Sequence, residues 1–126
     1  MDSNFRQLNI RERELLEKLL EGAIEGRDEL RIQMSSLTVK QIEKDGTLSL
    51  RCEFGPPSPG KYAPVAEGWC KDADGMTISV LLHVGKDGYM HMLEIMRLDG
   101  ADIVVPPSAR DMLVLLPESG GKKPGF

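Results

Sequence analysis

The stretch 76-MTISVLLHVGKDGYMHMLEIMRL-98 decides the fold, because two apolar runs flank a tight turn signal. The tripeptide Lys86-Asp87-Gly88 ends in glycine. This suits the three-residue hairpin loop in which a type I turn is followed by a left-handed residue. With that loop Gly85 faces Tyr89. Continued without interruption, the register predicts an almost wholly apolar face that packs on helices, formed by the pairs Val84–Met90, Leu82–Met92, Val80–Glu94 and Ile78–Met96.

The opposite face of this hairpin is mixed in character. The same register pairs His83 with His91 and Leu81 with Leu93 there. A shift of one residue in the pairing would exchange the two faces, because successive side chains of a strand point to opposite sides.

Further strands are predicted on either side of this hairpin. The turn tripeptide recurs at Lys44-Asp45-Gly46, and the segment 48–54 that follows alternates Leu, Leu, Cys and Phe with polar residues. Asp74-Gly75 marks another turn and predicts a strand over 65–71, and Asp99-Gly100 leads into a short strand over 101–105. The segment 55–64 contains four prolines and two glycines, and it predicts a long surface loop.

Two helices are predicted before the strands. Asn9 is an N-cap with Glu12 three residues later, and the leucines between 15 and 20 recur with the spacing of a buried helix face. A shorter helix fits 28–34. The sequence therefore predicts the α+β class: two N-terminal helices packed on an antiparallel β-meander of about five strands. A single domain over 1–117 and a disordered C-terminal tail over 118–126 are expected, with Ser108 capping a short helix before that tail.

Composition narrows the classes of function. The chain has 126 residues, a net charge of −4 and a pI of about 5.2, which argues against a nucleic-acid-binding surface. The charged N-terminal stretch does not resemble a signal peptide, and no apolar run reaches bilayer length, so a cytoplasmic protein without membrane contact is expected. Cys52 and Cys70 are expected to be free thiols.

Four segments carry a resemblance to a known family. These are NIRERELLEKLLEG from residue 9, GRDELR from residue 26, ADGMTISVLLHV from residue 73 and MLEIMRLDG from residue 92. They resemble a family of small bacterial proteins known only as a domain of unknown function, over about residues 8–105. The resemblance implies no activity, cofactor or catalytic residue.

Candidate contact residues come from the residue types alone. His83 and His91 are the only histidines and are expected to be cross-strand neighbours, although no further ligands for a metal accompany them. Glu94 is predicted to lie on the apolar face, where burial would raise its pKa. Tyr62 and Trp69 flank the end of the proline-rich loop, and Arg97 lies on the same strand as Glu94.

These residues leave more than one function open. We expect no cofactor, no metal and no catalytic motif, since none of the common catalytic or phosphate-binding signatures occurs. The leading hypothesis is a non-enzymatic protein-interaction module, with a protein partner or a homodimer contacting the sheet. The alternative is a small-ligand-binding protein or minor enzyme with a pocket near Trp69 and the 55–64 loop, in which Glu94, Arg97 or the histidines converge.

Overall fold

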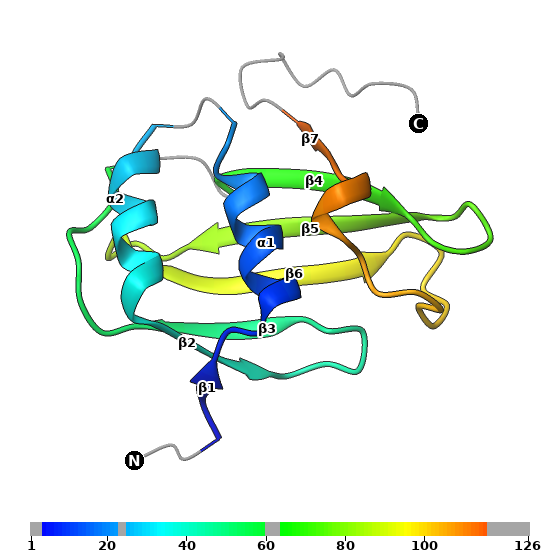
Figure 1. The fold of residues 1–126 in the computed structure, drawn as a ribbon, viewed down its shortest axis with the longest axis horizontal. Helices are drawn as coiled ribbons and strands as arrows, with labels where there is room; N and C mark the ends of the chain where they lie inside the picture. The colour runs from blue at the N-terminus through cyan, green and yellow to red at the C-terminus, as the bar shows by residue number, and fades with distance from the viewer. Residues whose placement is uncertain (1–3, 23–24, 60–63, 116–126) are drawn as a thin grey trace.

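A computed structural model describes residues 4–22, 25–59 and 64–115 as a helix layer on one face of a sheet (Figure 1). The α+β class and the antiparallel sheet are confirmed, but the sheet has seven strands rather than about five. A short strand also precedes the helices. The elements are β1 (Arg6–Gln7), α1 (Ile10–Leu19), α2 (Arg27–Gln33), β2 (Leu37–Gln41), β3 (Leu48–Cys52), β4 (Ala66–Lys71), β5 (Thr77–Val84), β6 (Met90–Arg97) and β7 (Leu113–Leu115), with 3-10 turns at Met34–Ser36 and Ala109–Asp111.

The strand order is β1-β2-β3-β6-β5-β4-β7, which is not a simple meander. After β3 the chain passes beyond the positions of β6 and β5, and then returns through β5 to place β6 beside β3. The predicted tail over 118–126 lies outside the described residues, and so do residues 116 and 117 of the predicted domain.

Helix α1 begins as the sequence predicts. The Asn9 side chain accepts a hydrogen bond from the Glu12 amide (2.8 Å), and the Glu12 carboxylate accepts one from the Asn9 amide (3.0 Å). Arg6 of β1 binds both oxygens of Glu12 at 2.8 Å, so the pKa of this carboxyl is lowered, mainly by the hydrogen bonds from Arg6. The apolar buried side of α1 consists of Leu15, Leu16 and Leu19, continued by the C-cap residue Leu20, and none of these four is accessible to solvent.

The β5–β6 hairpin differs from the predicted register beyond its first pair. Val84 does pair with Met90, and the Gly85 amide donates to the Tyr89 carbonyl. A bulge then inserts His91, so that His83 pairs with Met92 and every later pair is shifted by one residue. The helix-covered face therefore takes Leu93 and Ile95 from β6. The prediction that Met92, Glu94 and Met96 lie on that face is wrong, because one extra residue exchanges the two faces of a strand.

Aspartate–glycine pairs form the predicted turns, and their glycines have positive φ: Asp45-Gly46, Asp74-Gly75, Asp87-Gly88 and Asp99-Gly100. In each pair the aspartate side chain accepts a hydrogen bond from the amide two residues later, at 3.0–3.1 Å. Such a turn needs only an aspartate and a following residue that can adopt the left-handed conformation. The turns therefore form where the sequence alone predicts them.

The C-terminal part of the described chain differs from expectation. Residues 101–105 form no strand, and the segment expected to continue a helix after Ser108 instead forms β7 at the sheet edge. Ser108 does cap a short helical turn, since its hydroxyl accepts a hydrogen bond from the Arg110 amide. Met112, just before β7, is buried over Gly68 of β4, where an added Cβ would meet its sulfur.

Candidate functional site

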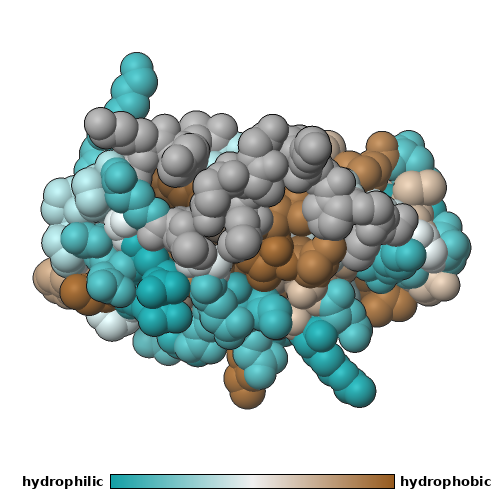
Figure 2. All heavy atoms as spheres, turned by 90° about the horizontal axis from the view of Figure 1, so that it is seen from above, coloured by the Kyte–Doolittle hydropathy of each residue, from teal (hydrophilic) through white to brown (hydrophobic). Residues whose placement is uncertain are grey.

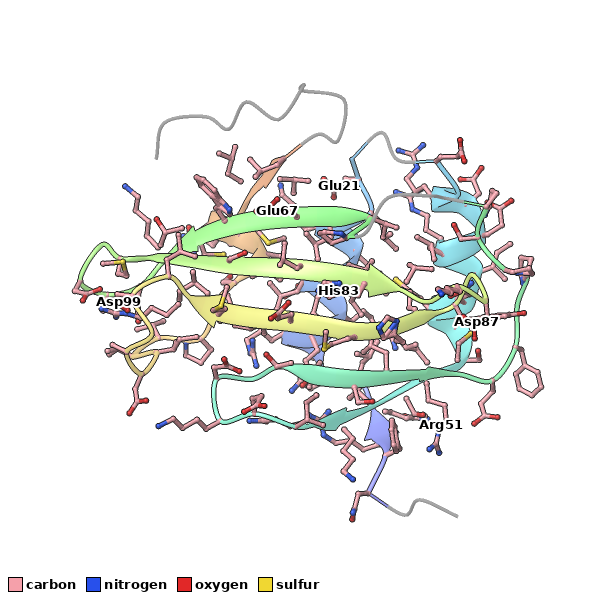
Figure 3. All side chains as sticks on the ribbon, turned by 180° about the vertical axis from the view of Figure 1, so that it is seen from behind. Glu21, Arg51, Glu67, His83, Asp87 and Asp99 are labelled. Atoms are coloured by element: carbon pink, nitrogen blue, oxygen red, sulfur yellow. The ribbon has the colours of Figure 1, made fainter. Side chains whose placement is uncertain are left out.

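The face of the sheet that the helices do not cover, here called the open face, is the candidate site (Figure 3). Because successive side chains of a strand point to opposite faces, the residues that alternate with the core-facing ones lie on the open face. Its apolar members are Trp69, Leu81, Met92, Met96, Leu113 and Leu115. Its charged or ionisable members are Lys40, Arg51, Glu67, Lys71, His83 and Glu94.

His83 and Glu94 form a hydrogen-bonded pair near the centre of this face. The Glu94 carboxylate accepts a hydrogen bond from His83 Nε2 at 2.9 Å, and both side chains are partly exposed. Glu94 lies directly across from Leu81, and His83 directly across from Met92. The pair is thus polar and has apolar neighbours on the open face. Glu94 is therefore not the desolvated carboxylate on the helix-covered face that the sequence predicted.

His91 remains close to His83 despite the bulge. Their ring centroids are 6.2 Å apart, as expected for neighbours across the hairpin, although His91 no longer pairs directly with His83. Among the described residues, no group of three or more histidine, cysteine, aspartate or glutamate side chains is arranged to hold a metal ion.

Trp69 lies on the open face of β4, between Ser79 of β5 and Leu113 of β7. Its indole N–H donates to Glu67 Oε2 at 3.0 Å, which fixes the ring over the strand. Trp69 is half-buried. Tyr62, the other aromatic candidate, lies outside the described residues.

Arg97 points to the other side of the sheet and has a structural role. It is only 7% exposed and binds Asp72 (2.7 Å), Asp99 (2.8 Å) and Asp74. The hydrogen bonds that Arg97 donates to these aspartates raise the pKa of Arg97. Asp72 also accepts the amides of Val104 and Val105, and these hydrogen bonds, with those from Ala73 and Arg97, hold its pKa far below the usual value. The cluster thereby ties the segment after β6 to the β4–β5 turn.

Gln33 is a buried residue that the sequence did not single out. Its side-chain N–H groups donate to the carbonyls of Pro56 and Gly88, both at 2.9 Å, and its oxygen accepts the Met90 amide at 3.0 Å. It joins α2, the proline-rich segment and the β5–β6 hairpin. No local pattern marks such a residue, because its three partners are distant in sequence.

The described part of the proline-rich loop, residues 55–59, lies at the surface as predicted, and it is docked on the β5–β6 hairpin; it is here called the strap. Ser58 is buried and its amide donates to the Gly88 carbonyl at 2.8 Å, while the Tyr89 hydroxyl donates to the Gly55 carbonyl at 2.9 Å. The strap therefore lies at the Asp87 end of the sheet, whereas the Arg97 cluster lies at the Asp99 end (Figure 3).

Within the described part of the chain, Trp69, Glu94 and Arg97 do not converge, while residues 60–63 of the loop in the alternative hypothesis lie outside it. Trp69 pairs with Ser79, about 17 Å along β5 from the hairpin turn that holds the strap. Arg97 and Glu94 lie on opposite faces. A groove of about 500 Å³ does run between α1 and α2, but it is lined by other residues: Arg13, Glu17, Glu21, Arg31, Met34 and Ser35.

Comparison with known proteins places the chain in a family without adding an activity. Among the described residues, no helix is long and apolar enough to cross a bilayer. No curated protein and no solved structure matches the chain. Residues 5–107, which include every strand except β7, match one family model. The chain belongs to the family described as Domain of unknown function (DUF6984).

Proposed function

We propose that this domain is a protein-interaction module and that the open face is its contact surface. The observation that carries the proposal is the set of apolar side chains on a sheet face that no described helix or strand covers. A sheet normally buries one face and exposes a polar one. Here Leu81 of β5 lies diagonally across from Met92 and Met96 of β6, on the face away from the helices, with Glu94 between the two methionines.

The chemistry of the face suits a folded partner with an apolar, nearly uncharged surface. The charged side chains of the open face are three basic ones, Lys40, Arg51 and Lys71, and two acidic ones, Glu67 and Glu94. A strongly acidic or basic partner would gain little from this balance. Trp69 adds the residue type most enriched among energetic hot spots of interfaces.

A catalytic role has less support from the same residues. The His83–Glu94 pair resembles a base with its orienting carboxylate, but its neighbours on the open face are Leu81, Met92 and Met96. Such side chains bury area against a partner and do not move protons or attack a substrate. The geometry therefore favours contact over catalysis.

The test is affinity capture from a native lysate with two matched variants. Leu81→Glu puts a charge in the centre of the open face. Ile32→Glu puts the same charge on the outer side of α2, where Ile32 is 54% exposed and where hydrophilic residues prevail (Figure 2). We expect the wild type and Ile32→Glu to retain the same partner and Leu81→Glu to lose it. Capture that is insensitive to Leu81→Glu, or that is absent with the wild type, contradicts the proposal.

A further inference from the structure

We infer that the seat of the strap is a recognition site for a proline-rich peptide segment of another protein, and that the strap itself occupies this site here. The seat is formed by Gly26, Gln33, Ser36, Gly88 and Tyr89. It lies between α2 and the end of the β5–β6 hairpin, where the chain that leaves β3 passes alongside α2 (Figure 1). The inference concerns a different surface from the open face and goes beyond the proposed function.

Two hydroxyl groups bind the backbone where the strap begins. The Ser36 hydroxyl accepts the amide of Phe54, the residue before the strap, and donates to the Phe54 carbonyl, both at 2.9 Å. The Tyr89 hydroxyl donates to the Gly55 carbonyl at 2.9 Å. These hydrogen bonds use backbone groups only, so a separate peptide that follows the same path can make them.

A buried side-chain amide continues this recognition of the backbone. Gln33 Nε2 donates to the Pro56 carbonyl at 2.9 Å, and the Gly88 carbonyl accepts the Ser58 amide at 2.8 Å. Gln33 is fully buried, and its other two hydrogen bonds, to the Gly88 carbonyl and from the Met90 amide, involve the hairpin rather than the strap. The hairpin therefore orients this donor independently of the strap, and such preorganisation favours binding.

Two glycines give the seat its shape. A Cβ on Gly88 would lie 2.7 Å from Pro57 Cβ. A Cβ on Gly26 would overlap the Ser58 hydroxyl and would lie 3.0 Å from Pro59 Cδ. The strap thus lies directly against backbone that carries no side chain, which is the usual reason for glycine where a chain approaches closely.

The composition of the strap indicates the class of peptide. Residues 55–59 are GPPSP, which contains a P-x-x-P pattern from Pro56 to Pro59. Proline has a fixed φ and no amide, so such a segment loses little conformational entropy on docking and needs few acceptors. Domains that bind P-x-x-P segments use grooves lined by aromatic residues. Here Tyr89 contributes the aromatic residue, and Gln33 contributes a further donor.

The strap competes with any peptide added from solution. Because it belongs to the same chain, its effective concentration at the seat is in the millimolar range. The wild type should therefore bind a separate peptide weakly, and a weakened strap should make the seat accessible.

The experiment is fluorescence anisotropy with a labelled peptide of residues 53–59, EFGPPSP. The receptor is the full chain with the strap weakened by Pro56→Gly, Pro57→Gly and Pro59→Gly together. We expect this variant to bind the peptide at least about tenfold more tightly than the wild type does, since its own strap competes less. Pro57→Gly alone repeats the test should the triple variant fail to fold.

Matched variants in the weakened-strap background locate the contact. Tyr89→Phe should weaken peptide binding about fivefold, because it removes one hydrogen bond and keeps the ring. Leu81→Glu on the open face and Ile32→Glu on the outer side of α2 should leave the affinity unchanged. A control peptide with glycine in place of the three prolines should bind at least about tenfold more weakly.

Several outcomes overturn the inference. One is no binding to either weakened-strap variant at about 1 mM peptide. Equal affinity for the wild type, or binding that is insensitive to Tyr89→Phe, would place the contact elsewhere. Equal affinity for the glycine control peptide would exclude a site for proline-rich segments. None of these results bears on the proposed function, which depends on Leu81 and is tested by lysate capture.

Discussion

The side chain of Gln33 takes the place of a neighbouring strand for the Met90 amide. Strands β3 and β6 pair at only two positions, Leu48 with Leu93 and Ser49 with Met92. Beyond the second pair, Met90 donates to Gln33 Oε1 at 3.0 Å instead. Beyond the first pair, the Thr47 hydroxyl donates a hydrogen bond to the Ile95 carbonyl and accepts one from the Ile95 amide. The two halves of the sheet are thus joined by a short seam with a polar side chain at each end.

Replacement of Gln33 by alanine should destabilise the fold by about 3 kcal/mol. It removes the partner of three backbone groups that are buried or partly buried. Each unsatisfied buried group costs about 1–3 kcal/mol, and the cost is smaller where water can reach the group. Urea denaturation measures the change. Gln41→Ala is the matched control, since Gln41 is exposed and its side chain donates to the carbonyl of Glu43, two residues away. A Gln33→Ala protein as stable as Gln41→Ala would show that the seam does not depend on this side chain.

Gly88→Ala should be more destabilising than Gly75→Ala. Both glycines end an Asp-Gly turn with nearly the same φ, +86° and +89°, so both variants carry the same backbone strain of about 1–2 kcal/mol. At Gly75 a Cβ meets nothing within 4 Å, whereas at Gly88 it would lie 2.7 Å from Pro57 Cβ. Overpacking against the strap should add about 1–3 kcal/mol. Equal unfolding free energies for the two variants would mean that the strap is not docked on the hairpin.

Gly68→Ala should destabilise the domain by about 1–3 kcal/mol, as overpacked cores do. The new methyl group would overlap the Met112 side chain and lie 3.2 Å from Leu19 Cδ2. Trimming Met112 to alanine makes room for it. In a double-mutant cycle measured by thermal unfolding, Gly68→Ala should therefore cost less in the Met112→Ala background. Purely additive effects would exclude this close approach.

Stability should fall when the pH drops below about 4, the ordinary aspartate pKa. The pKa values of Asp72, Asp74 and Asp99 are all lowered in the folded state, through hydrogen bonds from backbone amides and from Arg97. Carboxylates of this kind stabilise the fold above their unfolded-state pKa, and the stabilisation is lost as the pH falls toward the lower folded-state pKa.

Urea midpoints measured across this pH range check the expectation. Asp72→Asn should lower the midpoint at pH 7 and should flatten the acid limb of the profile. Glu14→Gln, a change at an exposed position of α1, should keep the shape of the wild-type profile. An unchanged acid limb in Asp72→Asn would contradict the stabilising role of the cluster.

Trp69 should report directly on the open face, because it is the only tryptophan of the chain. Acrylamide should quench its fluorescence less when the partner captured by the open face is bound, since that partner then covers the half-buried ring. In Leu81→Glu, addition of the same partner should leave the quenching unchanged. A wild type whose quenching is equally unaffected by the partner would place Trp69 outside any contact.

Local chemistry made several elements predictable from the sequence. The Asn9–Glu12 capping box starts α1 as expected, and the Asp-Gly pairs close their turns. The strand over 65–71 and the pairing of Val84 with Met90 were also predicted correctly. Each of these features depends on residues a few positions apart, so the segment itself contains the physical cause.

The candidate site was predictable in its residue types but not in its arrangement. His83, Glu94 and Trp69 could be singled out, yet the bulge at His91 moved Glu94 and two methionines from the helix-covered face to the open one. A single unpaired residue decides this, and whether it forms depends on the packing of both strands rather than on either sequence.

By itself the sequence determined where α1 begins, where the chain turns and which segments alternate, because hydrogen bonds between near neighbours and the two-residue period of a strand act locally. Only the tertiary structure decided the strand order, the register beyond the bulge, the role of Gln33 and the burial of Arg97 among three aspartates. These depend on partners that are 20 or more residues apart in most cases, as in the 25 residues from Asp72 to Arg97. The free energy of such contacts exists only once the helix layer and the sheet have packed together.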